Sequence, residues 1–344
     1  MNNEVAKMGE IVGDWPFVSV FVAARNEEAN ILLCLKSLQQ QSYPGKWEVL
    51  VADDHSEDRT SEIAENAARK DARIHPFVVP DSTGKIQGKA LALAHMAERA
   101  EGDVFLICDA DMQMPPTWMQ KMVSTLKPGK VDLVNGTTST IGDNWFSAFQ
   151  AIDWLLPQGT FAWLSQLGVT YTAMGNNMGI TRKAYEATGG YFQIPFSLTE
   201  DFELFKKARS KGFNLIHLYN SDVFGISSPQ RSPLDWLNQH VRWMNGFAQL
   251  PLNQQWVFYG QLLFYPILFL SLFSSTSELF SILGLIWFVK LLYNAALLSQ
   301  IKQFHLLVWL PFYEIIFWPA YFTCWLRFIF SKSVQWKGRS WKKE

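Results

Sequence analysis

The stretch Val104-Phe105-Leu106-Ile107-Cys108-Asp109-Ala110-Asp111 decides the fold. Its apolar part has the length of a buried strand, and it ends in two acids one residue apart. Side chains at i and i+2 of an extended chain point to the same side, so both carboxylates would face one way at the carboxyl end of the strand. Open α/β sheets bind ligands at that end. The pair is therefore either a site for a divalent cation whose other ligands come from a diphosphate, or a solvated Asp-x-Asp turn.

The residues before this stretch alternate between strand and helix. Apolar runs at 17–23, 47–52, 75–79 and 104–108 predict strands, and segments at 31–38, 58–69 and 90–99 predict helices. This order predicts an α/β fold with a mostly parallel sheet and helices on both faces. Later segments predict a strand at 131–138 and helices at 145–167, 199–210 and 233–250. Between them, Gly175-Asn176-Asn177 predicts a loop that approaches another part of the molecule closely.

Charge and apolar content divide the 344 residues unevenly. The net charge of −1 gives no support for a nucleic-acid partner. An N-terminal extension at 1–15 contains acids and no apolar core, so we expect neither a signal peptide nor an anchor there. Residues 16–250 are typical of a soluble domain. The charged side chains of residues 251–330 are Glu278, Lys290, Lys302, Glu314 and Arg327.

Three apolar stretches, 256–275, 279–299 and 306–330, predict a C-terminal α-helical membrane region, with a buried helical core as the alternative. The basic tail at 331–344 favours a cytoplasmic C-terminus. Three full spans would place it opposite a cytoplasmic N-terminal domain, so the first or the last stretch could be re-entrant. The three cysteines lack any disulfide or metal spacing, which suits a reducing compartment. We therefore expect a multi-pass or partly re-entrant protein of the inner (cytoplasmic) membrane, with its soluble domain in the cytoplasm.

Further polar residues stand at the ends of predicted elements. Asp53-Asp54 follows the second strand, and Glu200-Asp201 opens a helix. Gln239, Arg242 and Trp243 have the spacing of one helical face. An arginine beside a tryptophan can hold a phosphate and stack on a ring, or it can anchor an interfacial helix.

Six short motifs together resemble family-2 inverting glycosyltransferases of GT-A fold, over about residues 16–250. In chain order they are Ala23-Ala24-Arg25-Asn26-Glu27, Asp53-Asp54-x-Ser56-x-Asp58-x-Thr60, Gly88-Lys89-x-x-Ala92-Leu93, Asp109-x-Asp111, Thr199-Glu200-Asp201 and Gln239-x-x-Arg242-Trp243. Each motif is common alone, and their order makes the resemblance specific. It implies a Rossmann-like domain that binds a nucleotide-sugar donor.

The resemblance also implies roles for the matching residues. Ala23, Arg25 and Glu27 would line the nucleotide pocket, Asp53 and Asp54 would meet the base or ribose, and Lys89 would lie near the base or phosphates. Asp109 would contact ribose or metal-bound water, and Asp111 would ligate Mg²⁺ or Mn²⁺. Asp201 would be the general base and Glu200 a further catalytic residue. Arg242 would clamp the diphosphate, and Trp243, with Gln239, would border the acceptor. Open alternatives are a surface pair for Arg25 and Glu27, a solvated helix start for Lys89, a structural Asp53, and a helix-dipole role for Glu200.

The membrane region guides the choice of acceptor. Two or three spans cannot enclose a channel for a polar polymer in a monomer, which favours transfer of one sugar to a membrane lipid. We expect a metal-dependent hexosyltransferase using a nucleoside-diphosphate sugar, with UDP-sugar the commonest donor in such families. The alternatives are a processive polysaccharide synthase and a non-catalytic, nucleotide-sugar-binding membrane subunit.

Overall fold

The computed structural model describes residues 15–82, 84, 86–195, 197–250, 252–273, 277–331, 333–336 and 339–342. The predicted N-terminal extension lies outside the described residues except for Trp15, as do Lys332, Lys337 and Lys343 of the basic tail. The chain forms two compact units. Unit 1 comprises Met1–Thr138, Leu164–Phe196 and Glu200–Ile226, and unit 2 comprises Ser139–Trp163, Ser197–Thr199 and Ser227–Glu344.

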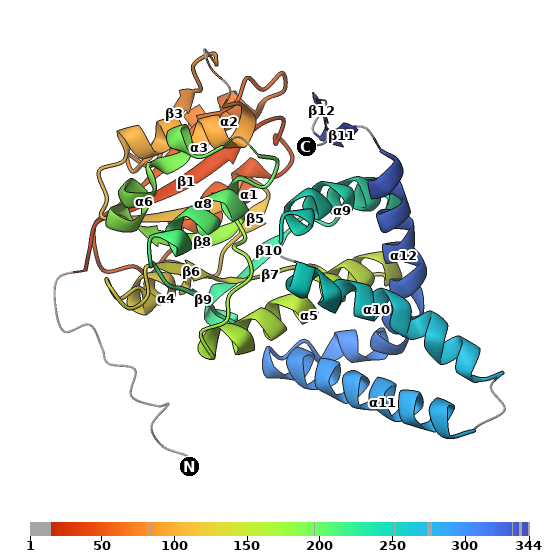
Figure 1. The fold of residues 1–344 in the computed structure, drawn as a ribbon. Helices are drawn as coiled ribbons and strands as arrows, with labels where there is room; N and C mark the ends of the chain where they lie inside the picture. The colour runs from red at the N-terminus through yellow and green to blue at the C-terminus, as the bar shows by residue number, and fades with distance from the viewer. Residues whose placement is uncertain are drawn as a thin grey trace. The chain divides into compact units, whose positions relative to one another are not determined.

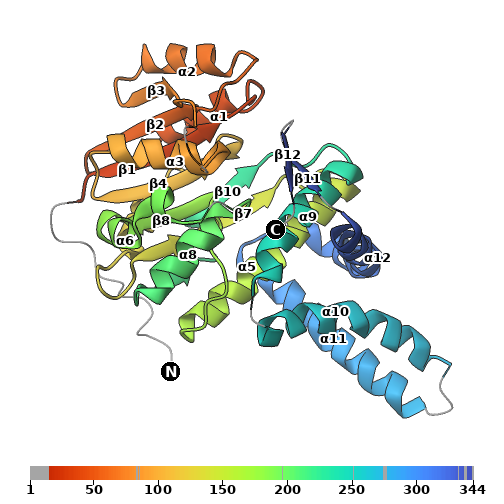
Figure 2. The same cartoon turned by 45° about the horizontal axis from the view of Figure 1, so that its top comes forward.

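Unit 1 is built on a seven-stranded sheet with the order β3-β2-β1-β4-β8-β6-β9 (Figure 1). Strands β3, β2, β1 and β4 run parallel to one another, β8 runs antiparallel to β4 and β6, and β9 is parallel to β6. Figure 2 shows the succession from β3 through β2, β1 and β4 to β8. The predicted mostly parallel α/β sheet is confirmed. Its strands are β1 Val18–Ala24, β2 Trp47–Asp53, β3 Ile74–Val78, β4 Val104–Asp109, β6 Leu133–Asn135, β8 Asn177–Thr181 and β9 Leu215–His217.

Helices cover both faces of this sheet, because successive strand residues point to opposite sides. Val20 and Val22 of β1 are buried in one cluster with side chains of α1, α2 and α4. On the opposite face the Phe21 and Phe105 rings pack 4.9 Å apart, and α3 contacts β1 and β2. The helices of unit 1 are α1 Ile31–Gln39, α2 Thr60–Ala68, α3 Gly88–Arg99, α4 Trp118–Thr125, α6 Arg182–Thr188, α7 Gly190–Gln193, α8 Glu200–Ser210 and the 3₁₀ turn η1 Ser221–Val223.

The strand predicted at 131–138 is divided in two. The chain leaves β6 at Gly136 and continues as β7, Thr137–Thr140, in a small sheet with the order β5-β10-β7, where β5 is Met112–Gln113 and β10 is Phe224–Ser227. A Cβ at Gly136 would lie 2.3 Å from Oδ1 of Asn177, so only glycine fits there. The Asn177 amide donates to the carbonyl oxygens of Thr137 and Val223, at 2.9 and 3.0 Å. This buried amide fixes the position at which the strand breaks.

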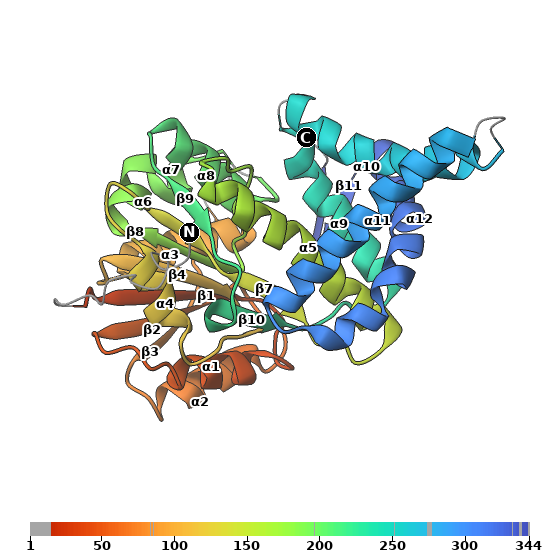
Figure 3. The ribbon, with the colours of Figure 1, turned by 90° about the horizontal axis from the view of Figure 1, so that it is seen from below.

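Unit 2 is largely helical (Figure 3). A buried carboxylate, Asp153 of α5, accepts hydrogen bonds from His240 of α9 at 2.9 Å and from Tyr321 and Tyr313 of α12 at 2.7 and 3.3 Å. Residues of α5 and α9, which the sequence assigns to 16–250, therefore pack with C-terminal helices. The elements are α5 Trp145–Gln166, which runs on into unit 1, α9 Pro233–Ala248, α10 Leu252–Ser271, α11 Ser277–Gln300, the 3₁₀ turn η2 Phe304–Val308, α12 Leu310–Phe330, β11 Ser333–Trp336 and β12 Arg339–Lys342.

The three apolar stretches coincide with helices α10, α11 and α12. Within the described ranges, one helical segment, Glu278–Gln300, is long and apolar enough to cross a membrane, and Phe258–Ser271 is a shorter apolar helix. Only 17% of the apolar window in Glu278–Gln300 is buried. Length and composition alone also suit a core helix of a soluble protein, so membrane spanning and its topology stay a prediction.

Candidate active site

The carboxyl ends of β1 and β2 are joined by Arg25 and Asp54. The Asp54 N–H donates to the carbonyl of Ala24 at 2.8 Å. Arg25 Nη1 donates to the Asp54 carbonyl at 2.7 Å and lies 4.0 Å from its carboxylate. The Nε–H of Arg25 is buried without a hydrogen-bond partner among the described residues. Arg25 therefore keeps a buried donor beside Asp54 at the edge where open α/β sheets bind ligands.

Asp53 and Glu27 hold the loops around this pair. Asp53 Oδ1 accepts hydrogen bonds from the N–H and hydroxyl of Ser56, at 3.1 and 2.5 Å. The Glu27 N–H donates to the Thr60 hydroxyl at 2.7 Å, and its carboxylate accepts from the Asn30 amide at 2.8 Å. These contacts tie the segment after β1 to the start of α2 and keep the two strand ends in fixed conformations.

Lys89, at the start of α3, is the centre of a second group. Its Nζ lies 2.6 Å from Asp109 Oδ1 and 3.2 Å from Glu200 Oε1, and it donates to the Gly175 carbonyl at 3.3 Å. Burial alone would lower the pKa of Lys89, but the carboxylates of Asp109, Glu200 and Asp201 raise it above its ordinary value. Lys89 is thus held as a cation between the end of β4 and the start of α8.

Asp201 lies in the first turn of α8. Its Oδ2 accepts from the Gly175 N–H at 2.6 Å and its Oδ1 from the Phe202 N–H at 2.8 Å. Burial, followed by the nearby Glu200 carboxylate, raises the pKa of Asp201 to about 6, although Lys89 and the two N–H groups oppose the shift. A carboxylate with that pKa is suited to accept a proton near neutral pH.

The loop before β8 approaches Asp201 as the sequence predicts. A Cβ on Gly175 would lie 2.9 Å from the Asp201 Cβ, so a larger residue would displace one of the two. The same peptide segment accepts from Lys89 and donates to Asp201. The sequence singled out this loop but did not identify its partner, because the contact joins residues 26 positions apart.

Asp109 and Asp111 are the candidate metal ligands. Asp109 ends β4 in register with Ala23, and Asp111 follows in the turn before β5. Two carboxylates are the hard oxygen donors that Mg²⁺ and Mn²⁺ prefer. No group of three or more His, Cys, Asp or Glu side chains is placed to hold an ion within the part of the chain that the structure describes. These residues fit a metal that draws its remaining ligands from a bound diphosphate and water.

The motif Gln239-x-x-Arg242-Trp243 lies on α9, in unit 2. Ser232 caps this helix, accepting from the Asp235 N–H at 3.2 Å, and Pro233 begins it. Gln239 is buried, and Arg242 Nη1 donates to the Leu198 carbonyl at 3.0 Å. A Cβ on Gly246 would lie 2.9 Å from the Thr199 hydroxyl. Arg242 and Gly246 therefore fasten α9 to the residues that precede Glu200 in the sequence.

Trp243 has its own support within unit 2. Its ring makes edge-to-face contacts with Trp154 at 5.0 Å and with His240 at 4.6 Å between centroids. His240 is in turn bound to Asp153. Sequence reasoning missed Asp153, although it is the only charged residue in the aromatic helix α5, and an isolated acid in such a helix is a usable signal.

The structure thus gathers Lys89, Asp109, Glu200 and Asp201 in unit 1, with Arg25 and Asp54 as a neighbouring pair on the same sheet. A Rossmann-like sheet with carboxylates at its strand ends is the architecture of a GT-A domain. Residues 19–189 match the profile described as Glycosyl transferase family 2, and the chain belongs to that family.

The chain is similar to two further sequences and to one solved structure. The chain is 30% identical over 202 residues to a beta-monoglucosyldiacylglycerol synthase of Nostoc sp., covering 57% of this chain and 42% of that protein. It is 27% identical over 238 residues to glycosyltransferase AglE of Haloferax volcanii, covering 68% and 74%. The mannosyltransferase PcManGT of Pyrobaculum calidifontis, solved with GDP-Man and Mn²⁺, shares the fold with a TM-score of 0.54 and 20% identity, over 93% of this chain and 88% of that one. The match spans less than half of the Nostoc protein's length.

Proposed function

We propose that this chain is an inverting glycosyltransferase that moves one sugar from a nucleoside-diphosphate sugar to a lipid hydroxyl, with Asp201 as the general base. The observation that carries the proposal is the Asp201 carboxylate, held by the N–H groups of Gly175 and Phe202 with a pKa of about 6. At pH 7 to 8 it is ionised and still basic enough to take a proton in the transition state.

The proposed reaction is a single displacement. The acceptor oxygen attacks the anomeric carbon as the bond from that carbon to the diphosphate oxygen breaks, and the hydroxyl proton passes to Asp201. Attack opposite the leaving group inverts the anomeric centre and forms no covalent sugar intermediate. Lys89, fixed as a cation between Asp109 and Glu200, offsets negative charge on the donor side. A divalent cation at Asp109 and Asp111 would stabilise the negative charge that develops on the diphosphate.

The residues at the ends of β1 and β2 would hold the nucleoside. The buried Nε–H of Arg25 offers a donor, and Asp54 offers a carboxylate for ribose or base. Arg242 would clamp the diphosphate while it keeps its bond to the Leu198 carbonyl, and Gln239 and Trp243 would border the acceptor. A guanidinium carries five N–H donors, so one protein contact does not exhaust it.

A lipid acceptor is supported by the C-terminal helices. α10, α11 and α12 expose many large apolar side chains, an arrangement that a bilayer would cover. The Nostoc relative is named for a diacylglycerol product, which makes diacylglycerol the first acceptor to test. We place the enzyme at the inner (cytoplasmic) membrane, with a catalytic domain at 16–250, membrane-associated helices at 251–330 and a basic tail at 331–344.

The test is a transfer assay with the purified full chain, Mg²⁺ or Mn²⁺, radiolabelled nucleotide sugars (UDP-sugars first) and extracted lipids including diacylglycerol. We expect label in one discrete organic-soluble product, lost with chelator and lowered at least about 10²-fold by Asp201→Asn. Glu203→Gln is the matched control, because Glu203 lies on the same helix and pairs with Lys206 at 2.7 Å. Label only in high-molecular-weight material would instead identify a polysaccharide synthase. Retained nucleotide binding without any transfer would identify a binding subunit.

A further inference from the structure

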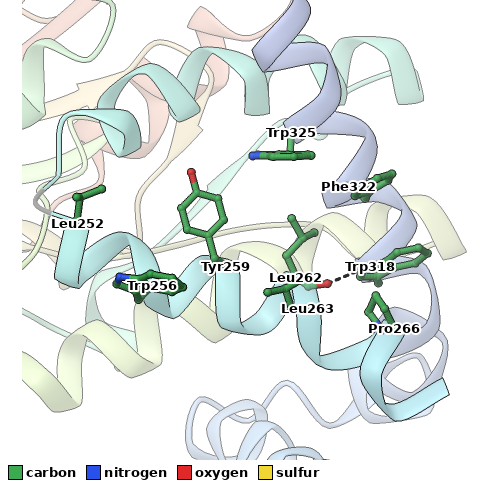
Figure 4. A pocket seen from close by; sticks show the side chains of 9 residues that line it. All are labelled: Leu252, Trp256, Tyr259, Leu262, Leu263, Pro266, Trp318, Phe322 and Trp325. Atoms are coloured by element: carbon green, nitrogen blue, oxygen red, sulfur yellow. Dashed lines mark hydrogen bonds between the residues drawn. The ribbon is translucent and has the colours of Figure 1, made fainter. Parts of the chain in front are cut away.

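A cavity of about 360 Å³ lies between α10 and α12, within unit 2 (Figure 4). Four of its nine lining side chains are aliphatic and five are aromatic, and none is charged. Small-molecule sites have this size and this apolar character, with a few polar groups that fix orientation. The ligand that suits such a lining is a hydrocarbon chain.

The two ends of the cavity differ in polarity. Leu262, Leu263 and Pro266 line one end, where the Trp318 indole N–H is already bonded to the Leu262 carbonyl at 2.7 Å. Figure 4 shows the Tyr259 hydroxyl pointing away from these residues. An amphipathic molecule would therefore place its hydrocarbon at the Pro266 end and its polar group at the Tyr259 end.

The Tyr259 end of the cavity lies next to α9, the helix that carries Trp243. The Phe247 ring lies 4.9 Å from Phe258 and 6.2 Å from Tyr259, between centroids. Phe247 is four residues after Trp243, so both lie on one face of α9 about 6 Å apart along its axis. The polar end of the cavity is thus one helical turn from the residue expected to border the acceptor.

The cavity also opens onto an apolar surface. Leu263 in its wall is 54% exposed, and the exposed side chains of Ile267 and Leu270 continue along α10. α10 contacts α11, which contains the segment long and apolar enough to cross a membrane. A lipid chain could therefore enter sideways from a bilayer without crossing water.

We propose that this cavity binds one acyl chain of the lipid acceptor and directs its headgroup toward the Trp243 face of α9. The inference rests on the proposed function for the identity of the lipid, and on the cavity itself for the site. It adds a chain-length requirement: a chain that passes from a bilayer into the cavity leaves one apolar environment for another, so its preference depends on how well it fills about 360 Å³.

The test places the full chain in phosphatidylcholine nanodiscs with either diacylglycerol or phosphatidylcholine carrying a photoreactive diazirine in one acyl chain. We expect the diacylglycerol probe to label α10 and α12 at least fivefold more than the phosphatidylcholine probe. Leu263→Trp should lower that labelling at least fivefold by filling the cavity. Leu270→Trp is the matched control, because Leu270 is also an exposed leucine of the same helix (64%) but lies outside the lining. Labelling of this variant should stay within twofold.

Three results would overturn the inference: equal labelling by both probes, labelling confined to other segments, or labelling unchanged by Leu263→Trp. A parallel transfer assay with diacylglycerols of increasing chain length distinguishes a failure of the acyl-chain site from a failure of the proposed function. Transfer with a KM that is independent of chain length and of Leu263→Trp would refute the cavity and leave the function standing. Labelled α10 and α12 without transfer to any lipid would refute the function and leave an acyl-chain site.

Discussion

Replacing Asp201 by asparagine should make the protein more stable at neutral pH while removing its activity. The pKa of Asp201 rises from 3.8 to about 6 on folding, because burial and Glu200 disfavour its charge. A shift of about 2 units at about 1.4 kcal/mol per unit corresponds to about 3 kcal/mol of unfolding free energy. Above pH 6 the ionised Asp201 therefore lowers the free energy of unfolding by about this amount.

The sign of the pH dependence follows from proton binding. Between pH 3.8 and 6 the folded state binds more protons at Asp201 than the unfolded state does, so stability falls as pH rises through this window. An asparagine stays neutral at every pH. The stability gain of Asp201→Asn should therefore be complete above about pH 7 and disappear below about pH 4.

Thermal unfolding of the full chain in detergent, followed by tryptophan fluorescence from pH 4 to 8, measures this difference. For a domain of 150–250 residues, about 3 kcal/mol is equivalent to a rise in Tm of roughly 6–12 °C. Glu203→Gln should give no such gain at pH 7.5, because it removes an ion pair with Lys206 instead of a repulsion. An unchanged Tm at pH 7.5, or a gain that persists undiminished at pH 4, would refute the reasoning.

Further predictions concern the neighbours of Asp201. Glu200→Gln removes a like charge, so the acidic limb of the pH profile of kcat/KM should move to lower pH; a shift upward would contradict the assigned electrostatics. Lys89→Met should move the acidic limb of the kcat/KM profile to higher pH and should lower kcat. Lys46→Met, at an exposed lysine, should do neither. Gly175→Ala places a methyl 2.9 Å from the Asp201 Cβ and should lower kcat at least about tenfold, while calorimetry should show intact donor binding. An unchanged kcat would mean that the loop moves without displacing Asp201. Chelation should abolish transfer and added Mn²⁺ or Mg²⁺ restore it, and full activity in chelator would exclude Asp109 and Asp111 as metal ligands.

Local patterns were enough to predict the parallel strands β1 to β4, but not β8, whose segment was predicted only as a loop. The apolar run before Asp109 and the alternation of elements before it gave the parallel strands, because both follow from side-chain periodicity. The break at Gly136 was missed, since it depends on the Asn177 side chain from a strand about 40 residues later. A pattern within one segment cannot report such a contact.

The candidate site also has a part that is encoded locally and a part that depends on tertiary contacts. The acids at strand ends were predictable individually, because elements and their ends are encoded locally. The peptide of Gly175, which accepts from Lys89 and donates to Asp201, joins residues 86 and 26 positions away. The assignment of α5 to the C-terminal helices likewise depends on Asp153 meeting His240, Tyr313 and Tyr321. Tertiary contacts of this kind become visible only in three dimensions.

The contacts of α9 with Leu198 and Thr199 have a consequence for protein engineering. Arg242 is bonded to Leu198, 44 positions earlier, and Gly246 is fitted closely to Thr199, and both partners lie outside the continuous C-terminal segment. A chimera that exchanges everything after Ser227 for the matching part of another family member would join a foreign helix to a native tripeptide. Grafts that carry their own 197–199 should keep the packing of α9 and unfold at the parental temperature, and those that omit it should unfold at a lower temperature.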